Sequence, residues 1–133
     1  MNKESLCKAA LAARRNAYAP YSGCLVGAAL LAQDGTVYTG CNVENASYSA
    51  TLCAERTAIA KAVSEGKREF AMLAVAGGEG DMLNGGFPPC GICRQVMVEF
   101  CSPDFKVLVV TSPNTYTEYT LAELLPAAFS LPS

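Results

Sequence analysis

The chain has 133 residues, of which 51% are hydrophobic, and a formal net charge of −2 at pH 7. This length and composition predict one domain, residues 1–133, with a substantial core. The small negative charge argues against nucleic acid as a partner, because a domain that binds it normally presents a basic surface. The longest apolar run, residues 25–32, is far shorter than the roughly 20 residues that cross a bilayer, and residues 1–11 lack the apolar stretch of a secretory signal. We therefore expect a cytoplasmic protein with no role at a membrane.

The N-terminal half predicts a helix, a hairpin and a second helix. Small apolar residues recur at helical spacing in the first segment, and Arg14 near its end suits the negative end of a helix dipole. Asp34-Gly35 between two apolar runs is a strong hairpin signal, and Gly66 provides a helix stop. These observations predict a helix over residues 3–18, strands over 24–32 and 36–41, and a helix over 52–65.

The C-terminal half alternates strands and helices around one long loop. A glycine-rich loop of this length is usually functional. Strands separated by helices predict crossover connections, so we expect an α/β fold in which helices cover both faces of a mixed sheet. The predicted elements are a strand over residues 70–76, the loop over 77–89, a helix over 90–101, a strand over 106–111 and a short helix over 121–125.

Seven cysteines and no histidine direct the search for a functional site. An odd number of cysteines in a chain without a secretory signal favours thiol or metal chemistry over a disulfide framework. Without histidine, a zinc site must use thiolates or carboxylates, and a general base at neutral pH must be something other than imidazole. The cysteines lie at positions 7, 24, 41, 53, 90, 93 and 101.

Three of these cysteines lie at the starts of two predicted helices. Cys90 and Cys93 open one helix after Pro89, and their spacing lets both sulfurs reach one ion, while the helix N-terminus favours their thiolate form. Cys53 opens the other helix and is the third candidate ligand. Three protein ligands leave one tetrahedral position open, which is typical of catalytic zinc. Taken alone, the cysteine pair is equally compatible with a redox or structural role.

Glu55 is the candidate proton carrier. Residues at positions i and i+2 face apart inside a helix, but side chains lean toward the N-terminus, so Cys53 and Glu55 can both approach an ion just off the helix axis. In a chain without histidine, we expect Glu55 to act as general acid and base. The arrangement C-x-E…P-C-x-x-C matches the three-cysteine form of the H-x-E…P-C-x-x-C pattern of zinc deaminases.

Distinctive segments beyond this motif lie at residues 18–22 (YAPYS), 26–30 (VGAAL), 42–48 (NVENASY), 89–95 (PCGICRQ) and 124–129 (LLPAAF). With them, the sequence resembles the small three-cysteine cytidine deaminases over nearly its whole length. The resemblance implies a three-layer α/β/α sandwich with a mixed five-stranded sheet, one Zn²⁺ per subunit and a homotetramer. It also implies hydrolysis of cytidine and deoxycytidine to uridine and deoxyuridine with release of ammonia, a step of pyrimidine salvage.

The resemblance assigns substrate contacts to residues outside the metal motif. It implies that Asn42 and Glu44 bind the sugar hydroxyls and that the Ala54 backbone binds the pyrimidine carbonyl oxygen. Tyr48 and Phe129 resemble residues that complete the pocket of a neighbouring subunit. A carboxylate at the 3′-hydroxyl would repel a 3′-phosphodiester, so free nucleosides are expected as substrates rather than DNA or RNA.

Arg56 is a candidate for balancing charge at the metal. Three thiolates exceed the charge of Zn²⁺ by one, which weakens the ion as a Lewis acid unless a cation offsets the excess. We expect the Arg56 guanidinium to hydrogen-bond the ligands from outside the coordination sphere. In the implied reaction, activated water attacks C4 of the ring, and Glu55 passes one proton to N3 before a second transfer lets ammonia leave.

Two departures and two alternatives remain at this point. Cys24 stands where the family commonly has phenylalanine, which weakens stacking on the nucleoside unless another aromatic such as Phe87 compensates. The loop over residues 77–89 is a few residues longer than expected. Blasticidin-type aminohydrolases share the zinc pattern, although the Asn42 segment favours a ribose site. A non-enzymatic zinc module would need a fourth protein ligand, for which Cys41 and Cys101 are the candidates.

Overall fold

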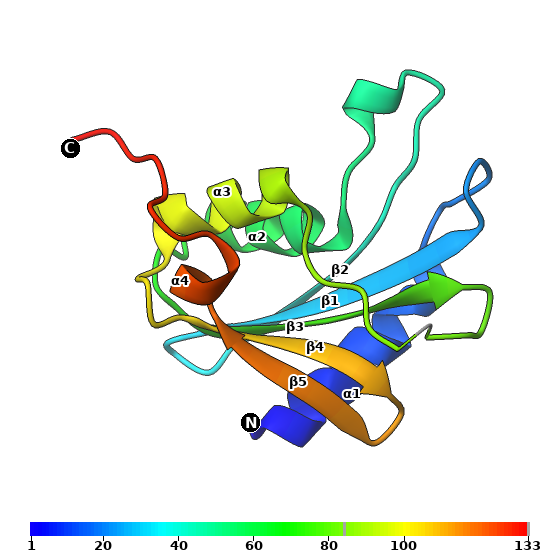
Figure 1. Ribbon diagram of the computed structural model, residues 1–133, viewed down its shortest axis with the longest axis horizontal. Coiled ribbons are helices and arrows are strands. Elements are labelled where there is room, and N and C mark those ends of the chain that lie inside the picture. Colours follow the sequence, from blue (N-terminus) through cyan, green and yellow to red (C-terminus); the bar gives the residue numbers. More distant parts are fainter. Residues whose placement is uncertain (84, 133) are drawn as a thin grey trace.

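A mixed sheet forms the centre of the computed structural model, which describes residues 1–83 and 85–132. The strand order is β2-β1-β3-β4-β5 (Figure 1). β3 and β4 run parallel, whereas the other neighbouring pairs are antiparallel, which confirms the mixed sheet. The strands are β1 (Cys24–Ala32), β2 (Val37–Cys41), β3 (Phe70–Glu79), β4 (Lys106–Ser112) and β5 (Thr115–Thr120).

Helices cover both faces of this sheet and complete the expected α/β/α sandwich. In Figure 1, α1 lies beneath the sheet, while α2, α3 and α4 lie above it. No helix within the described residues is both long and apolar enough to cross a membrane. The helices are α1 (Lys3–Ala13), α2 (Ala54–Ser64), α3 (Gly91–Phe100) and α4 (Leu121–Leu124).

Two apolar clusters hold the three layers together. Because successive side chains of a strand point to opposite faces, Ala28 and Leu30 of β1 enter one cluster while Ala29 enters the other. The first cluster packs the sheet against α2 and α3, and its members include the fully buried Met97. The second packs the sheet against α1 through residues such as Leu6. Burial of this apolar surface is the main force that fixes the helices on the sheet.

Gly40 lets the first turns of α2 lie directly on the sheet. A Cβ on Gly40 would lie 2.5 Å from both the Ala54 carbonyl oxygen and the Ala58 nitrogen. Any side chain at position 40 would therefore push the N-terminal end of α2 away from β2. This close approach fixes the position of the helix start that carries Cys53.

β5 is the strand that the sequence pattern does not predict. It consists of threonine, tyrosine and glutamate residues, whose side chains are exposed or half-buried. β5 is an edge strand that pairs with β4 alone among the described strands, so it needs no continuous apolar face. The period-two signal of a buried strand is absent for that reason. The five-stranded sheet implied by the family resemblance is nevertheless confirmed.

The first helix is shorter than the prediction over residues 3–18. α1 ends at Ala13, and one turn of 3₁₀ helix follows at Arg14–Asn16. Tyr18 then forms an isolated β-bridge with Val43, and its N–H donates to the carbonyl oxygen of Asn42 at 2.9 Å. Because this bridge requires extended backbone, the helix cannot continue to residue 18.

Arg14 lies at the end of α1, as predicted, but it is buried. Its guanidinium donates to the carbonyl oxygens of Leu25, Gly78, Gly80 and Met82 over 2.7–3.1 Å. These hydrogen bonds join the end of α1 to the start of β1, to the last residues of β3 and to the loop after it. A single side chain therefore fixes three segments that are far apart in the sequence.

Candidate active site

A cavity of about 290 Å³ opens beside the N-terminal ends of α2 and α3. Its wall brings together four segments: the start of β1, the chain after β2, the start of α2 and the chain before α3. Several predicted site residues thus meet in one place although they are distant in the sequence. The lining residues are Ser22, Cys24, Val26, Asn42, Glu44, Thr51, Leu52, Cys53, Ala54, Glu55, Phe87, Pro88 and Cys90.

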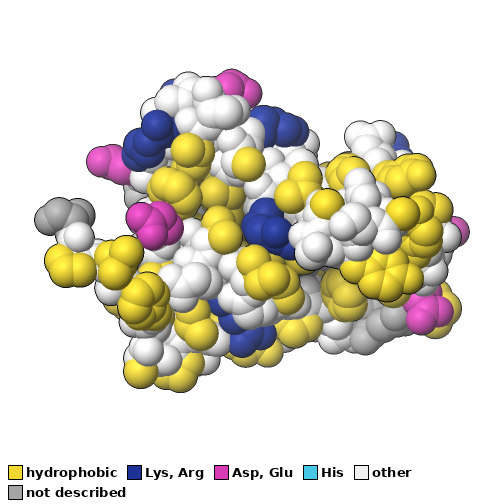
Figure 2. Space-filling view, turned by 90° about the horizontal axis from the view of Figure 1, so that it is seen from above, with side chains coloured by type: hydrophobic (Ala, Val, Ile, Leu, Met, Phe, Trp, Pro, Cys, Tyr) yellow, Lys and Arg dark blue, Asp and Glu magenta, His cyan; other side chains and the backbone are white. Residues whose placement is uncertain are grey.

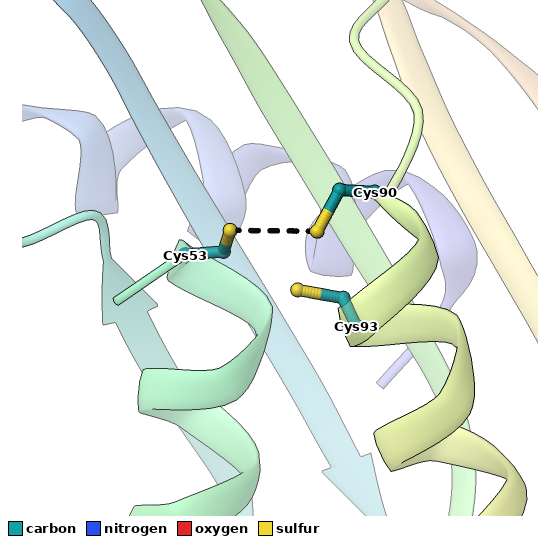
Figure 3. Close-up of side chains that lie close together, drawn as sticks. All are labelled: Cys53, Cys90 and Cys93. Atoms are coloured by element: carbon teal, nitrogen blue, oxygen red, sulfur yellow. Dashed lines mark hydrogen bonds between the residues drawn. The ribbon is translucent and has the colours of Figure 1, made fainter. Parts of the chain in front are cut away.

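Three cysteines converge at the two helix starts. Cys53 and Cys90 are the N-cap residues of α2 and α3, and Cys93 lies in the first turn of α3. Figure 3 shows their side chains pointing toward one another between the helices. The three sulfurs lie within 4.8 Å of one another, and the Cys53 and Cys90 sulfurs are 3.7 Å apart. Within the described residues this group has no fourth member, and neither Cys41 nor Cys101 belongs to it.

The geometry and acidity of these thiols fit a zinc ion. With Zn–S bonds of about 2.3 Å, tetrahedral ligands lie about 3.8 Å apart, close to the spacing of Cys53 and Cys90. The hydrogen bond from Cys93, aided by Arg56 and Cys90, lowers the pKa of Cys53 to about 5 even though burial opposes the change. The same hydrogen bond and burial raise the pKa of Cys93. The lowered pKa favours the thiolate form of Cys53, which is the form that binds zinc.

Arg56 places a positive charge beside these sulfurs. Its Nη2 lies 3.4 Å from the Cys53 sulfur and donates to the carbonyl oxygen of Thr51 at 3.2 Å. The hydrogen bond to Cys53 raises the pKa of Arg56. Arg56 Nε is buried and has no hydrogen-bond partner among the described residues. The guanidinium can therefore offset part of the negative charge of a three-thiolate site.

Glu55 lies in the first turn of α2, where its carboxyl group lines the cavity. The residue is only 3% exposed. Burial raises the pKa of Glu55 to about 7, and the negative charge of Cys53 adds to this effect. A carboxyl group with a pKa near neutrality can both accept and release a proton under physiological conditions. Next to a metal-binding group, it has the acidity that a proton carrier needs.

Asn42 and Glu44 line the part of the cavity that is formed after β2. The Asn42 amide accepts from Val26 N–H at 2.9 Å and donates to the Cys24 carbonyl oxygen at 2.8 Å, so it already bonds the backbone of β1. One N–H of its amide group remains for another partner. Glu44 accepts hydrogen bonds from the Ser22 hydroxyl and from the N–H groups of Tyr21 and Ser22. The Ser22 hydroxyl makes the largest contribution to the lowered pKa of Glu44, which keeps this carboxylate charged.

Of the three remaining residues predicted to contact the substrate, one lies at the cavity and two lie away from it. Ala54 is the first residue of α2, so its N–H has no partner within the helix and can bind a ligand. Tyr48 and Phe129 do not line the cavity of their own chain. Their exposed fractions are 77% and 67%. Tyr48 packs edge-to-face on Tyr21 with ring centroids 6.2 Å apart, and the Phe129 carbonyl oxygen accepts from Gln95.

Sequence reasoning missed several residues that build the cavity. Ser22 belongs to the distinctive YAPYS segment, but its hydrogen bond to Glu44 is seen only once that segment lies beside the chain after β2. Leu52 and Pro88 supply apolar wall, and single residues of these types carry no local signal. Phe87, considered above only as a compensating aromatic, does line the cavity together with Cys24. The cavity contacts of these residues form only when segments that are distant in the sequence pack together.

Comparison with known proteins agrees with this geometry. Residues 1–109 match the family described as "Cytidine and deoxycytidylate deaminase zinc-binding region". A cytidine deaminase of Sporosarcina psychrophila is 51% identical over 130 residues, which cover 98% of this chain and 93% of that protein. A cytidine deaminase of Halalkalibacterium halodurans is 49% identical, covering 98% and 96%.

Solved structures of cytidine deaminases are also similar to this chain in their fold. The crystal structure of cytidine deaminase from Burkholderia pseudomallei superimposes with a TM-score of 0.89 at 47% identity, covering 97% of this chain and all of that chain. A cytidine deaminase structure from Mycobacterium tuberculosis gives a TM-score of 0.82 at 40% identity, covering 98% and 99%. From the cysteine geometry and these matches, we conclude that the chain belongs to the cytidine and deoxycytidylate deaminase family.

Proposed function

We propose that this protein is a zinc-dependent hydrolase that deaminates cytidine and deoxycytidine to uridine and deoxyuridine and releases ammonia. The observation that carries this proposal is a cavity lined by Cys53, Glu55 and Cys90, with the Cys93 sulfur within 4.8 Å of the other two sulfurs. The relatives that cover nearly the whole chain are cytidine deaminases, which favours this reaction over that of a blasticidin-type aminohydrolase. The natural setting of the reaction is pyrimidine salvage.

The cofactor is zinc, one ion per subunit, and Cys53, Cys90 and Cys93 are the residues proposed to hold it. When bound, zinc supplies the Lewis acidity that makes water a nucleophile at neutral pH. Three thiolate ligands would leave zinc able to hold that water, and the adjacent cavity of about 290 Å³ has room for a substrate. Arg56 is proposed to keep the site from becoming too electron-rich to activate water, because its guanidinium bonds the Cys53 sulfur.

Glu55 is proposed to carry the protons of the reaction. As an oxygen–carbon bond forms at C4 of the pyrimidine, the Glu55 carboxylate accepts the proton of the attacking water and delivers it to ring N3. Glu55 then moves the remaining proton from the new C4 hydroxyl to the C4 amino group, the carbon–nitrogen bond breaks as the C4 carbonyl forms, and ammonia leaves. The pKa of about 7 allows Glu55 to act in both directions without a large energetic penalty.

Sugar recognition is proposed for Asn42 and Glu44. The free N–H of the Asn42 amide and the Glu44 carboxylate lie on the same cavity wall, and both are held in place by β1 or Ser22. A carboxylate accepts hydrogen bonds from sugar hydroxyls and repels a phosphate group. This arrangement supports free nucleosides as the substrate class. The Ala54 N–H is proposed to bind the carbonyl oxygen of the pyrimidine.

A homotetramer is proposed because two candidate substrate contacts lie away from their own cavity. Tyr48 and Phe129 are highly exposed aromatic side chains, which a second subunit could cover. Figure 2 looks down on the face that carries α2 and α3, and hydrophobic side chains gather there. An apolar hollow on the same helices is lined by Leu52, Arg56, Ile59, Ala60, Val63, Ser64, Val96 and Phe100.

A direct assay tests the proposed reaction. Ultraviolet absorbance is followed while the pure protein is incubated with cytidine, deoxycytidine or cytosine, with and without a metal chelator. We expect conversion of both nucleosides, loss of the activity after chelation, and recovery after zinc is added back. Turnover that survives complete removal of the metal, or no turnover of either nucleoside by zinc-loaded protein, would refute the proposal.

A further inference from the structure

The cavity contains an aromatic side chain to which the reaction and the sugar contacts assign no role. Among the residues that line it, Phe87 alone is aromatic, while its apolar neighbours are smaller side chains such as Cys24, Val26 and Leu52. Phe87 is 37% exposed. A phenyl ring that large and that accessible represents apolar surface that a ligand could cover.

The Phe87 ring lies in a space that a glycine keeps open. A Cβ on Gly77 would overlap the ring, with Phe87 Cγ only 2.9 Å away and the Val26 side chain at 3.0 Å. Gly77 of β3 and Val26 of β1 are register partners, so the ring rests on the sheet beside the cavity. Glycine at position 77 therefore admits an aromatic group where any other residue would displace it.

The loop that carries Phe87 is fixed at both of its ends. Arg14 donates to the carbonyl oxygens of Gly78, Gly80 and Met82 at one end. At the other end, Arg94 Nε donates to the carbonyl oxygen of Pro89 at 2.7 Å. The ring is consequently in position before a ligand arrives, and binding need not order it.

A pyrimidine nucleoside has a flat ring whose faces could cover the exposed Phe87 side chain. Hydrogen bonds from Glu55, the Ala54 N–H and Glu44 would satisfy the polar edges of the substrate, but the flat faces of its ring need apolar contact. Aromatic side chains bind nucleobase faces well because every base has a π surface. We propose that Phe87 is a specificity-determining residue that packs against the pyrimidine nucleoside in the cavity. This inference rests on the proposed function.

Substitution of Phe87 should change the binding of the nucleoside without changing the rate of the chemical step. Phe87→Ala is expected to raise the KM for cytidine about tenfold and Phe87→Leu about threefold, because base–aromatic contact is lost while the zinc site is intact. The kcat and the zinc content should stay within about twofold of the parent protein, a margin far below the effect of losing an acid–base residue. Phe87→Tyr should restore the parent KM because the ring is kept.

A second variant displaces the Phe87 ring without changing residue 87. Gly77→Ala places a methyl group where the Phe87 ring lies, so the KM should rise as it does in Phe87→Ala. Met82→Ala is the matched control, since this side chain lies in the same loop, is 66% exposed and does not line the cavity. Melting temperatures identify any variant that fails to fold.

The outcomes distinguish the inference from the proposed function. An unchanged KM in folded Phe87→Ala and Gly77→Ala would overturn the inference, as would a fall in kcat at constant KM. Calorimetric titration with uridine measures the same contact without turnover, and weaker binding by Phe87→Ala would support it. If the parent protein did not convert cytidine, the proposed function would fail, whereas the uridine titration would still decide the role of Phe87.

Discussion

Glu55 illustrates how one residue acquires its chemistry from its position. An ordinary glutamate is ionised at neutral pH, but this side chain is almost completely buried at the start of α2, and burial raises its pKa to about 7. The nearby Cys53 thiolate opposes a second negative charge and acts in the same direction. Because burial disfavours the charged carboxylate, Glu55 holds a proton at a pH at which an ordinary glutamate has lost it, as its proposed role as proton acceptor requires.

Replacement of Glu55 by glutamine tests this role directly. Glu55→Gln keeps the size and polarity of the side chain but cannot accept a proton, so kcat for cytidine should fall by at least about a hundredfold. Bound zinc, measured by elemental analysis, should not change. Glu65→Gln, on the exposed end of the same helix, serves as the control and should retain activity. Appreciable turnover by Glu55→Gln would exclude the assigned role.

Arg56 should affect both the metal and the rate. Arg56→Gln removes the positive charge beside Cys53, and the excess negative charge of three thiolates is then less well balanced. Because hydrogen-bond partners of metal ligands typically contribute ten- to a hundredfold, we expect kcat/KM to fall by about that range. Zinc release to a chelator, followed by a colorimetric dye, should also change in rate. Arg15→Gln, an exposed neighbour of Arg14, is the control; equal behaviour of the two variants would contradict this account.

At the scale of elements, the helix starts were predictable, whereas parts of the cavity wall, such as Leu52 and Pro88, were not. The spacing of Cys90 and Cys93 and the missing histidine identify the metal group from the sequence, because the ligand chemistry and local helix geometry are encoded within a few residues. Asn42 shows which contacts the sequence alone does not reveal. Its sequence position implies a sugar contact, but only the structure reveals that its amide also bonds the backbone of β1. β5 escaped prediction for a related reason, since an edge strand needs no apolar face.

The β1–β2 hairpin carries an ion pair that makes its stability dependent on pH. Asp34 accepts from the Thr36 N–H and pairs with Lys67 at 2.7 Å. The hydrogen bond from Lys67, with smaller contributions from Thr36, lowers the pKa of Asp34 from 3.8 to about 2. A carboxyl group with a lowered pKa in the folded state stabilises the protein above its unfolded pKa, and this stabilisation is lost as the pH falls toward the folded value.

Asp34→Asn should therefore be less stable than the parent protein at neutral pH. The difference in the free energy of unfolding should be constant above about pH 5 and should shrink as the pH falls from about 4 to about 2. Urea unfolding followed by circular dichroism across this range measures it. Asp81→Asn, which removes an exposed carboxylate from the loop after β3, is the comparison. A difference that does not vary with pH would refute the ion-pair explanation.

At the scale of the whole molecule, one chain is proposed to supply the catalytic group and a neighbouring chain to close the pocket. Glu55 is buried within the chain, whereas Phe129 lies on a C-terminal segment that extends away from the sheet (Figure 1). If the two act in the same site, they come from different subunits. The proposal thus predicts that substitutions at these two positions can compensate for each other in mixed assemblies.

Mixing two inactive proteins tests this arrangement. Glu55→Gln retains Phe129, and Phe129→Ala retains Glu55, so sites that combine the intact parts should form when the two variants are dissociated and reassembled together. We expect each variant alone to be weakly active and the mixture to regain measurable activity. Light scattering should report the mass of four chains. A monomeric mass, or a mixture no more active than the average of its components, would argue against shared sites.

The buried Arg14 anchors the loop after β3 in a way that does not depend on the side chains of that loop. Its guanidinium bonds only main-chain oxygen atoms, those of Leu25, of Gly78 in β3 and of Gly80 and Met82 in the loop, and every amino acid possesses such an atom. Side chains such as Met82 can therefore be exchanged without releasing the anchor, and the residue presented at position 87 can change independently of the fold. If Phe87 contacts the nucleoside as proposed, substitutions in this loop would alter the nucleoside preference without changing Cys53, Glu55 or the sheet.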